Sequence, residues 1–451
     1  GMSEKKTNSI GSRLNGHFDG KSNNIGLVNY RKQDPLLFTY LNFDIIKSNW
    51  DYRIEDLESY FILNFVENYG VYPICNNKTG AEIPVSDIKT HLKIDWNYFI
   101  YTVILIGFGL AMLASASAPM GYVKFNDSYF YLKRQFFYGI LPGALLFFIA
   151  LKANSEIFRR FAWIGYFACM GLLVAAFIPG LSLVINGSHS WIQIFGSSFQ
   201  PGEFMKLGLI FLLAAMLSDP RRNLKDWQYG LLPVLVFVAL PLGLVLLQPD
   251  LGTMLILGAI SFFMLFYAKV PWSYLIILGL LGLVVFIAMV AMKPYRMERL
   301  DMFMHPELDP QGVGYQVNQA FLAVGSGGFW GLGYGHSRQK YQYLPEVNAD
   351  SIFAVIAEEM GFIISIGLIF LIFLIAMRGL KIAKNCTDDF DRYIVVGVTA
   401  WFFCQSVINI GAMVGVMPLT GVPLPFVSHG GSATLISLAA VGVVLNLSKN
   451  D

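Results

Sequence analysis

Long apolar runs alternate with short polar segments through the last three quarters of the chain. A helix that crosses a membrane needs about 20 mostly apolar residues. Ten segments meet or approach that length; the fourth is short, and Gln248-Pro249-Asp250 alone separates the fifth from the sixth. The pattern predicts an all-α integral membrane protein, a bundle of about ten transmembrane helices. The predicted spans are 97–118, 135–152, 161–179, 203–218, 229–247, 251–269, 272–292, 351–378, 393–417 and 432–448.

Lysine and arginine in short loops indicate how such a bundle is oriented, because they concentrate on the cytoplasmic side. With ten spans, all of the basic loops fall on one side together with both termini, and we predict that this side is cytoplasmic. The opposite side then carries residues 118–134, 180–202, 293–350 and 418–431. The basic residues follow the second, fourth, sixth and eighth spans: Lys152, Arg159, Arg160, Arg221, Arg222, Lys225, Lys269, Arg378, Lys381, Lys384 and Arg392.

The composition agrees with a membrane protein. Of the 451 residues, 55% are hydrophobic and 14% are charged, compared with roughly 25% charged in soluble domains. The net charge is +2 and no basic stripe occurs, so nothing indicates nucleic acid as a partner. The four cysteines are scattered without metal-binding or disulfide spacing, and we expect Cys169 and Cys404 to pack in the core. The other two are Cys75 and Cys386.

Polarity divides the chain into three parts. Residues 1–95 form a polar extension, expected to be cytoplasmic, disordered over 1–35 and without a catalytic role. Within it, residues 56–72 are apolar enough for a short helix on the membrane surface. The first apolar run begins near residue 97, so we expect no signal peptide. The membrane domain covers 96–448, and 449–451 form a tail.

The loop at 293–350 is long for a connection between helices, and such loops are normally functional or disordered. Its aromatic residues, glycines and charges predict a structured loop that packs partly into the bundle. Its arginines, Arg296 and Arg299, and the glycine-rich run at 325–333 suit phosphate oxygens. An interpretation of equal weight is that the arginines extend to the membrane interface and the glycines only allow turns.

Several polar residues lie within or beside the spans, where ionisable groups are costly and are functional candidates. Glu203 and Lys206 are three apart and share one helix face. Asp350 directly precedes a span, and the local pattern favours helix capping over catalysis. Glu358 and Glu359 lie one turn or more into that span. Asp250 is expected to organise its turn, and Gln405, Asn409 and Ser428 to bond between helices.

Taken together, these motifs resemble the shape, elongation, division and sporulation (SEDS) family, the RodA/FtsW group of peptidoglycan glycosyltransferases. The resemblance covers roughly residues 96–448. The run Gly335 to Lys340 looks more like the division branch, FtsW, than the elongation branch, RodA. The motifs occur in the family's order: Gln200-Pro201-Gly202-Glu203 to Lys206, Gln248 to Thr253, Tyr295 to Arg299, Gly314-Tyr315-Gln316, Leu344-Pro345-Glu346 to Asp350, Glu358-Glu359-Met360-Gly361, Pro423 to Phe426, and Ser428 to Ser432.

The resemblance implies an enzyme that polymerises lipid II on the outer face of a bacterial cytoplasmic membrane, at the division septum. Asp350 takes the place of the family's essential acidic residue, and an ionised carboxylate there can serve as the general base for inverting β-1,4 transfer. The departing undecaprenyl diphosphate needs positive charge, and a divalent cation, Mg or Mn, is a further expectation. The implied partners are a class B penicillin-binding transpeptidase and other division-complex membrane proteins. Candidates for substrate binding are Glu203, Lys206, Arg296, Arg299, Lys340, Glu346 and Ser428.

Two positions depart from the family's pattern. Asn186 to Ser190 contains no arginine before Trp191-Ile192, where the family usually has one or two. His189 is there instead, as a weak substitute. His429 replaces the family's usual tyrosine. Two other functions remain open: a lipid II flippase, and a non-catalytic scaffold of a division complex.

Overall fold

The computed structural model describes residues 94–185, 188–194, 197–291, 297, 303–304 and 314–450. They belong to one compact unit, Leu92–Asp451. The predictions for the polar extension, including the helix at 56–72 and Cys75, lie outside the described residues, as do Arg296 and Arg299.

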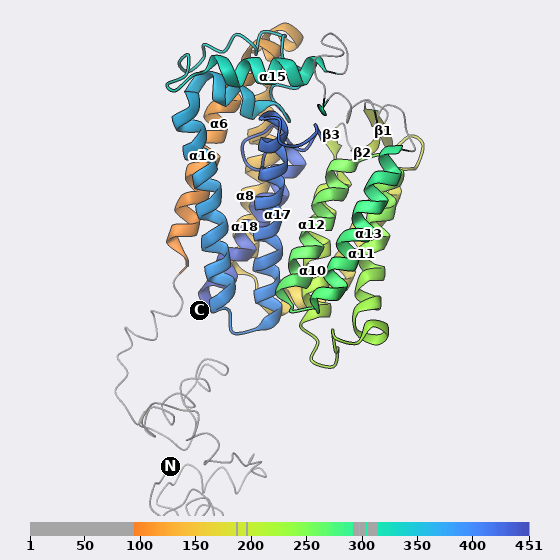
Figure 1. Cartoon of the computed structure of the whole chain (residues 1–451). Helices are drawn as coiled ribbons and strands as arrows, with labels where there is room; N and C mark the ends of the chain where they lie inside the picture. Colours follow the sequence, from red (N-terminus) through yellow and green to blue (C-terminus); the bar gives the residue numbers. More distant parts are fainter. Residues whose placement is uncertain are drawn as a thin grey trace, which may run out of the picture. The chain divides into compact units, whose positions relative to one another are not determined.

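Helices make up almost all of this unit, and a short sheet separates α9 from α10 (Figure 1). The second long helix, Phe130–Lys152, is continuous but has a π-helical turn at its centre. The elements are α6 (Trp96–Phe125), α7 (Phe130–Gln135), η2 (Phe136–Ile140), α8 (Leu141–Lys152), α9 (Ser155–Ala175), β1 (Ser182–Ile185), β2 (Ser188–Ile194), β3 (Ser197–Phe199), α10 (Pro201–Leu217), η3 (Trp227–Leu231), α11 (Leu232–Leu247), α12 (Leu251–Tyr267), α13 (Trp272–Ala291), α15 (Tyr315–Ser326), α16 (Ile352–Asn385), α17 (Asp389–Met413), α18 (Gly431–Leu447) and η4 (Ser448–Asn450).

A helix lies over each of the ten predicted spans. Within the described part of the chain, six helices are long and apolar enough to cross a membrane: α6, α7 to α8, α9, η3 to α11, α16 and α17. Helices α12, α13 and α18 are apolar but shorter, and α10 has 17 residues. The predicted helical, multi-pass membrane fold is therefore confirmed, while the number of ten crossings stays a prediction.

Ion pairs and hydrogen bonds join the helix termini at one end of the bundle. Arg378 near the end of α16 pairs with Asp95 at 2.7 Å, just before α6. The Asp95 backbone N–H donates to Ser448 Oγ after α18 at 3.1 Å, and Arg159 near the start of α9 pairs with Asp388 at the start of α17. Figure 1 shows the C-terminus at this end. Basic loops thus share one end, as expected, and their assignment to the cytoplasm stays a prediction.

The opposite end is covered by α15 and by the sheet. Figure 1 shows α15 lying crosswise over the ends of the upright helices, with the strands beside it above α10 to α13. The described part of the long loop is structured and packed into the bundle, since Ser337, Leu344 and Val347 are buried. The prediction of an ordered loop is confirmed for these residues.

The three-stranded sheet was not predicted from the sequence. Its strands are antiparallel in the order β1-β2-β3, with Leu183 opposite Trp191 and Ile192 opposite Phe199. The hydroxyl of Ser188 donates to the backbone carbonyl of Gln248 at 2.6 Å. This bond fixes the sheet to the turn between α11 and α12.

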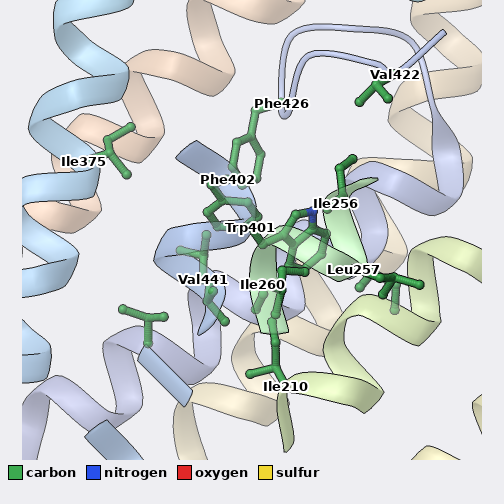
Figure 2. Close-up of a cluster of buried hydrophobic side chains, with 14 of the residues drawn as sticks. Ile210, Ile256, Leu257, Ile260, Ile375, Trp401, Phe402, Val422, Phe426 and Val441 are labelled. Atoms are coloured by element: carbon green, nitrogen blue, oxygen red, sulfur yellow. The ribbon is translucent and has the colours of Figure 1, made fainter. Parts of the chain in front are cut away.

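Aromatic and branched side chains fill the space between α10, α12 and α17 (Figure 2). Trp401 of α17 is almost fully buried and lies among Ile256 and Ile260 of α12 in Figure 2. Phe402, next in the chain, meets the ring of Phe426 edge to face at 5.1 Å. The core therefore reaches up to the turn at 418–431, which lies at the same end of the bundle as α15. Cys169 packs against this core, and Cys404 is half-buried.

Helix α16 is interrupted at Gly361, whose backbone has φ 72°. The glycine-rich run fills the interruption with its own backbone: the N–H groups of Leu332 and Gly333 donate to the carbonyls of Glu358 and Glu359 at 3.0 and 2.9 Å. Such exchange satisfies polar groups that the broken helix leaves without partners. The glycines allow this close approach. Gly328, Gly331 and Gly333 have positive φ, which agrees with the predicted role in turns, and the predicted contact with phosphate stays a prediction.

A substitution at Gly331 tests the contact between the glycine-rich run and the interruption of α16. Its φ is 76°, and an added Cβ would lie 2.2 Å from the carbonyl oxygen of Glu359. We expect Gly331→Ala to cost at least about 2 kcal/mol through overpacking and strain. The measurement is the unfolding temperature in detergent. Gly367→Ala is the control, because a Cβ added at Gly367 in α16 would have no atom within 4 Å. It should leave the unfolding temperature unchanged or slightly raised. An equal effect of the two changes would contradict a close contact at Gly331.

Candidate functional site

Two adjacent buried carboxylates of α16 organise the loop at 335–340. Glu358 accepts hydrogen bonds from the backbone N–H groups of Arg338 at 2.9 Å and Gln339 at 3.3 Å, and from the hydroxyl of Ser337. Glu359 accepts from the N–H of Gly335 at 3.0 Å. Each carboxylate is satisfied by several donors, which is the condition for burying such a group.

Lys340 provides the positive charge for these carboxylates. Its ammonium lies 2.7 Å from Glu359 and also donates to the Gly335 carbonyl at 2.7 Å and to Ser115 Oγ at 3.0 Å. These bonds use its three donors, and the side chain is 3% exposed. The structure therefore places Lys340 in a buried ion pair that shapes the loop. Its predicted contact with a substrate phosphate stays a prediction and would require it to exchange these partners.

Glu203 and Lys206 share a face of α10, as predicted, and pair at 2.7 Å inside the bundle. The Lys206 ammonium also donates to Gln405 Oε1 at 2.9 Å and lies 5.1 Å from the Trp401 ring centroid. Gln405 in turn donates to the Pro423 carbonyl at 2.8 Å. The pair is thus connected through α17 to the turn at 418–431, and the predicted interhelical bonding of Gln405 is confirmed.

Asp350 lies just before the N-terminus of α16 and is partly exposed. The N-cap position belongs to Ser351, whose hydroxyl accepts from Gln316 Nε2 at 3.0 Å, so the capping interpretation of Asp350 is wrong by one residue. Asn409 Nδ2 donates to the Asp350 carbonyl at 2.8 Å and to the Val422 carbonyl at 2.7 Å. These bonds place the Asp350 backbone against the turn at 418–431.

Ser428 adds a second connection between the same two segments. Its hydroxyl donates to the Ala349 carbonyl and accepts from the Leu424 N–H at 2.8 Å. The next N–H, that of His429, donates to the Asn348 carbonyl at 2.7 Å. Ser428 is buried, so these bonds position the backbone around Asp350. Its predicted contact with substrate stays untested.

A third segment, α7, completes this end of the bundle. Gln135 Oε1 accepts from the Gly430 N–H at 2.9 Å, and Nε2 donates to Thr434 Oγ1 at 2.6 Å. The ring of Tyr131 meets the ring of His429 edge to face at 5.2 Å. Glu346 is exposed and interacts electrostatically with Tyr131. The contribution of α7 to this end of the bundle was not predicted, although Lys133-Arg134-Gln135 at the start of the second span gave a signal for it.

The structure brings most of the predicted residues to one end of the bundle and connects them through backbone bonds. Asp350, Glu346 and Ser428 belong to the joined segments, and Lys340 belongs to the loop before them. Glu203 and Lys206 reach the same turn from inside the bundle. Asp250 organises its turn as predicted: it caps α12, accepting from the Thr253 N–H at 2.9 Å.

The chemistry available here is that of a carboxylate held at the surface of a rigid frame. A partly exposed carboxylate can accept a proton from a hydroxyl group that is brought within hydrogen-bond reach. Among the described residues there is no group of three or more His, Cys, Asp or Glu side chains that could hold a metal ion.

Removing Lys340 should be costly because it leaves Glu359 buried without its counter-ion. We expect Lys340→Met to destabilise the protein by about 3–5 kcal/mol, with a lower unfolding temperature in detergent. Lys133→Met is the matched control, because Lys133 pairs with Asp127 at 2.7 Å but is exposed, and it should have little effect. Adding Glu359→Gln to Lys340→Met should recover part of the loss. Equal effects of the two lysine changes would argue against a buried pair.

His429 predicts a pH dependence of stability. Burial, and secondarily the Arg134 guanidinium, lower the pKa of His429 from 6.5 to about 4. The unfolded chain therefore takes up this proton near pH 6.5 and the folded chain only near pH 4. The contribution is fully present above pH 6.5 and is lost as the pH falls towards 4, by up to about 3 kcal/mol.

The unfolding temperature of wild type and of His429→Phe, measured between pH 4 and 7, checks this. The variant should lose less stability on acidification than wild type. His336→Phe, at an exposed position, is the control and should follow the wild-type curve. Parallel curves for wild type and His429→Phe would show that the ring is not buried in its neutral form.

Comparison with known proteins places this geometry in a family. Residues 95–451 match the model of the FtsW/RodA/SpoVE family, described as a cell cycle protein. Stage V sporulation protein E of Bacillus subtilis is 39% identical over 350 residues, covering 78% of this chain and 95% of that protein. A probable peptidoglycan glycosyltransferase FtsW of Trichlorobacter lovleyi is 36% identical, covering 77% and 91%.

Solved structures show the same relationship. A chain from a peptidoglycan synthase complex that coordinates polymerization and crosslinking is 30% identical, with a TM-score of 0.66, and the match covers 79% of this chain and 98% of that one. The rod shape determining protein RodA of Thermus thermophilus is 28% identical, with a TM-score of 0.59, covering 79% and 97%. The fold, the motif order and these similarities agree: the chain belongs to the FtsW/RodA/SpoVE family.

Proposed function

We propose that the protein is a peptidoglycan glycosyltransferase that joins lipid II units into glycan strands and releases undecaprenyl diphosphate. The relatives named FtsW are probable peptidoglycan glycosyltransferases, and the similar synthase complex carries out polymerization and crosslinking. The observation that carries the proposal is Asp350, a partly exposed carboxylate whose backbone is held by Asn409 between two segments. Asp350 is the general base that takes the proton from the acceptor hydroxyl.

The reaction inverts the anomeric centre, because an α-linked diphosphate leaves as a β-1,4 bond forms. A single displacement needs the base on the acceptor side and positive charge on the departing diphosphate. Lys206 and Lys340 are committed to buried pairs with Glu203 and Glu359. Arg296 and Arg299, which lie outside the described residues, are therefore the stronger proposals among the predicted cations. A divalent cation, Mg or Mn, would be held chiefly by the substrate's diphosphate.

The setting follows from the same proposal. The protein spans a bacterial cytoplasmic membrane with both termini inside, and the end that carries Asp350 faces outwards, where the lipid-linked sugar is used. It acts at the division septum with a class B penicillin-binding transpeptidase and other division-complex proteins. The basic residues gathered at the opposite end, such as Arg378 and Arg159, support this orientation.

The test is polymerisation of lipid II by purified protein with its transpeptidase partner, with glycan strands resolved on gels. Asp350→Asn keeps the shape of the side chain but removes the base, and should lower the rate by at least about 100-fold. Asp127→Asn is the control and should keep the activity, because Asp127 is a partly exposed carboxylate at the same end that already pairs with Lys133. Repeating the assay with EDTA and with added Mg or Mn tests the cation.

Three results would change the proposal. Normal polymerisation by Asp350→Asn would remove Asp350 as the base. Movement of lipid II across vesicle membranes by a wild type that makes no polymer would favour a flippase. Partner binding without either activity would favour a scaffold.

A further inference from the structure

Within the described part of the chain, Arg134 is a cation without a partner in an otherwise well-bonded helix. Its neighbours on α7 are both engaged: Lys133 pairs with Asp127 at 2.7 Å, and Gln135 bonds to Gly430 and Thr434. Arg134 is half-buried, yet among the residues that the structure describes it forms no ion pair or hydrogen bond. A guanidinium kept partly out of water without a partner is costly, unless a ligand supplies the missing oxygens.

His429 presents a second unused polar group beside it. Its ring is fixed by the edge-to-face contact with Tyr131 at 5.2 Å and by the bond from its backbone N–H to the Asn348 carbonyl. The ring atom Nε2 is buried and has no hydrogen-bond partner among the residues that the structure describes. Arg134 acts on this ring electrostatically. The ring is neutral near pH 7, so it can donate one N–H without carrying charge.

Both groups border the segment that carries the proposed base. Asn348 comes two residues before Asp350, and the intervening Ala349 is held by the hydroxyl of Ser428. Gln135, next to Arg134, bonds to the N–H of Gly430, next to His429. The segments of Arg134, His429 and Asp350 are therefore joined by direct hydrogen bonds.

We propose that Arg134 and His429 form a phosphate subsite that holds the diphosphate of the lipid-linked sugar beside Asp350. The guanidinium gives two parallel N–H donors that match a phosphate, and the imidazole adds a third donor. Glu346, which interacts with Tyr131, is exposed and accepts from sugar hydroxyls rather than from phosphate. The cluster thus suits a ligand that carries both a sugar and a phosphate. The inference rests on the proposed function for the identity of that ligand.

The probe is farnesyl diphosphate, whose binding to the full chain in nanodiscs is measured at pH 7, with farnesol as the uncharged comparison. Arg134→Ala should raise the dissociation constant of the diphosphate about 10-fold or more and leave that of farnesol unchanged. Arg134→Lys keeps the charge and should retain part of the affinity. His429→Phe keeps the ring but lacks Nε2, and should weaken diphosphate binding less than Arg134→Ala does.

Lys133→Ala is the matched control, because it removes a neighbouring charge that already has a partner, and it should change the affinity less than 2-fold. Equal affinities for wild type and a folded Arg134→Ala would overturn the subsite, as would an effect of Lys133→Ala equal to that of Arg134→Ala. If wild type polymerises lipid II while Arg134→Ala binds normally, the subsite fails and the proposed function stands. If binding depends on Arg134 but no polymer forms, the function fails and the subsite stands.

Discussion

The end of the bundle that carries Asp350 depends on two negative charges buried side by side on α16. Burying a carboxylate is tolerable only when donors surround it, and Glu358 and Glu359 find theirs in the backbone of residues 335–339 and in Lys340. The loop therefore takes a fixed course over α16. Because Asp350 lies between that loop and the helix, its position depends on the same bonds.

Three hydrogen bonds hold the backbone at and just before Asp350. Asn409, Ser428 and the N–H of His429 donate to the carbonyl groups of residues 348–350. These bonds fix the point at which the Asp350 side chain leaves the backbone. A side chain in a site can be positioned in this way by neighbours that act on the backbone alone.

Much of the fold and of the candidate site could be predicted from the sequence, wherever a local pattern decides the structure. Apolar length located the spans, the spacing of Glu203 and Lys206 gave their pairing, and Asp250 after a proline gave a capped turn. The helix cap was predicted at Asp350 but lies at Ser351. An acidic residue and a serine are both good caps, and their order in the sequence does not distinguish them.

The remainder depends on partners that are distant in sequence. The charge of Lys340 is visible in the sequence, but its burial against Glu359 is not. Gly361 within an apolar run gives no sign of a break, because the break exists only where the glycine-rich run meets it. The short sheet was missed because its strands are brief and stabilised by contact with Gln248. Arg134 was overlooked because it differs from other basic residues only in having no partner among the described residues, which the sequence does not show.

The break at Gly361 also divides α16 into two parts. Before it, the side chains from Ser351 to Glu359 are all buried in protein; after it, Phe362, Ile363 and Ile364 are exposed. The apolar stretch from Phe362 to Met377 is about 24 Å long, most of the roughly 30 Å of hydrocarbon in a bilayer. Gly361 therefore separates a part of α16 that is enclosed by protein from a part whose apolar side chains are exposed. Glu358 and Glu359 lie on the enclosed side of that boundary, where their hydrogen-bond donors surround them and lipid does not.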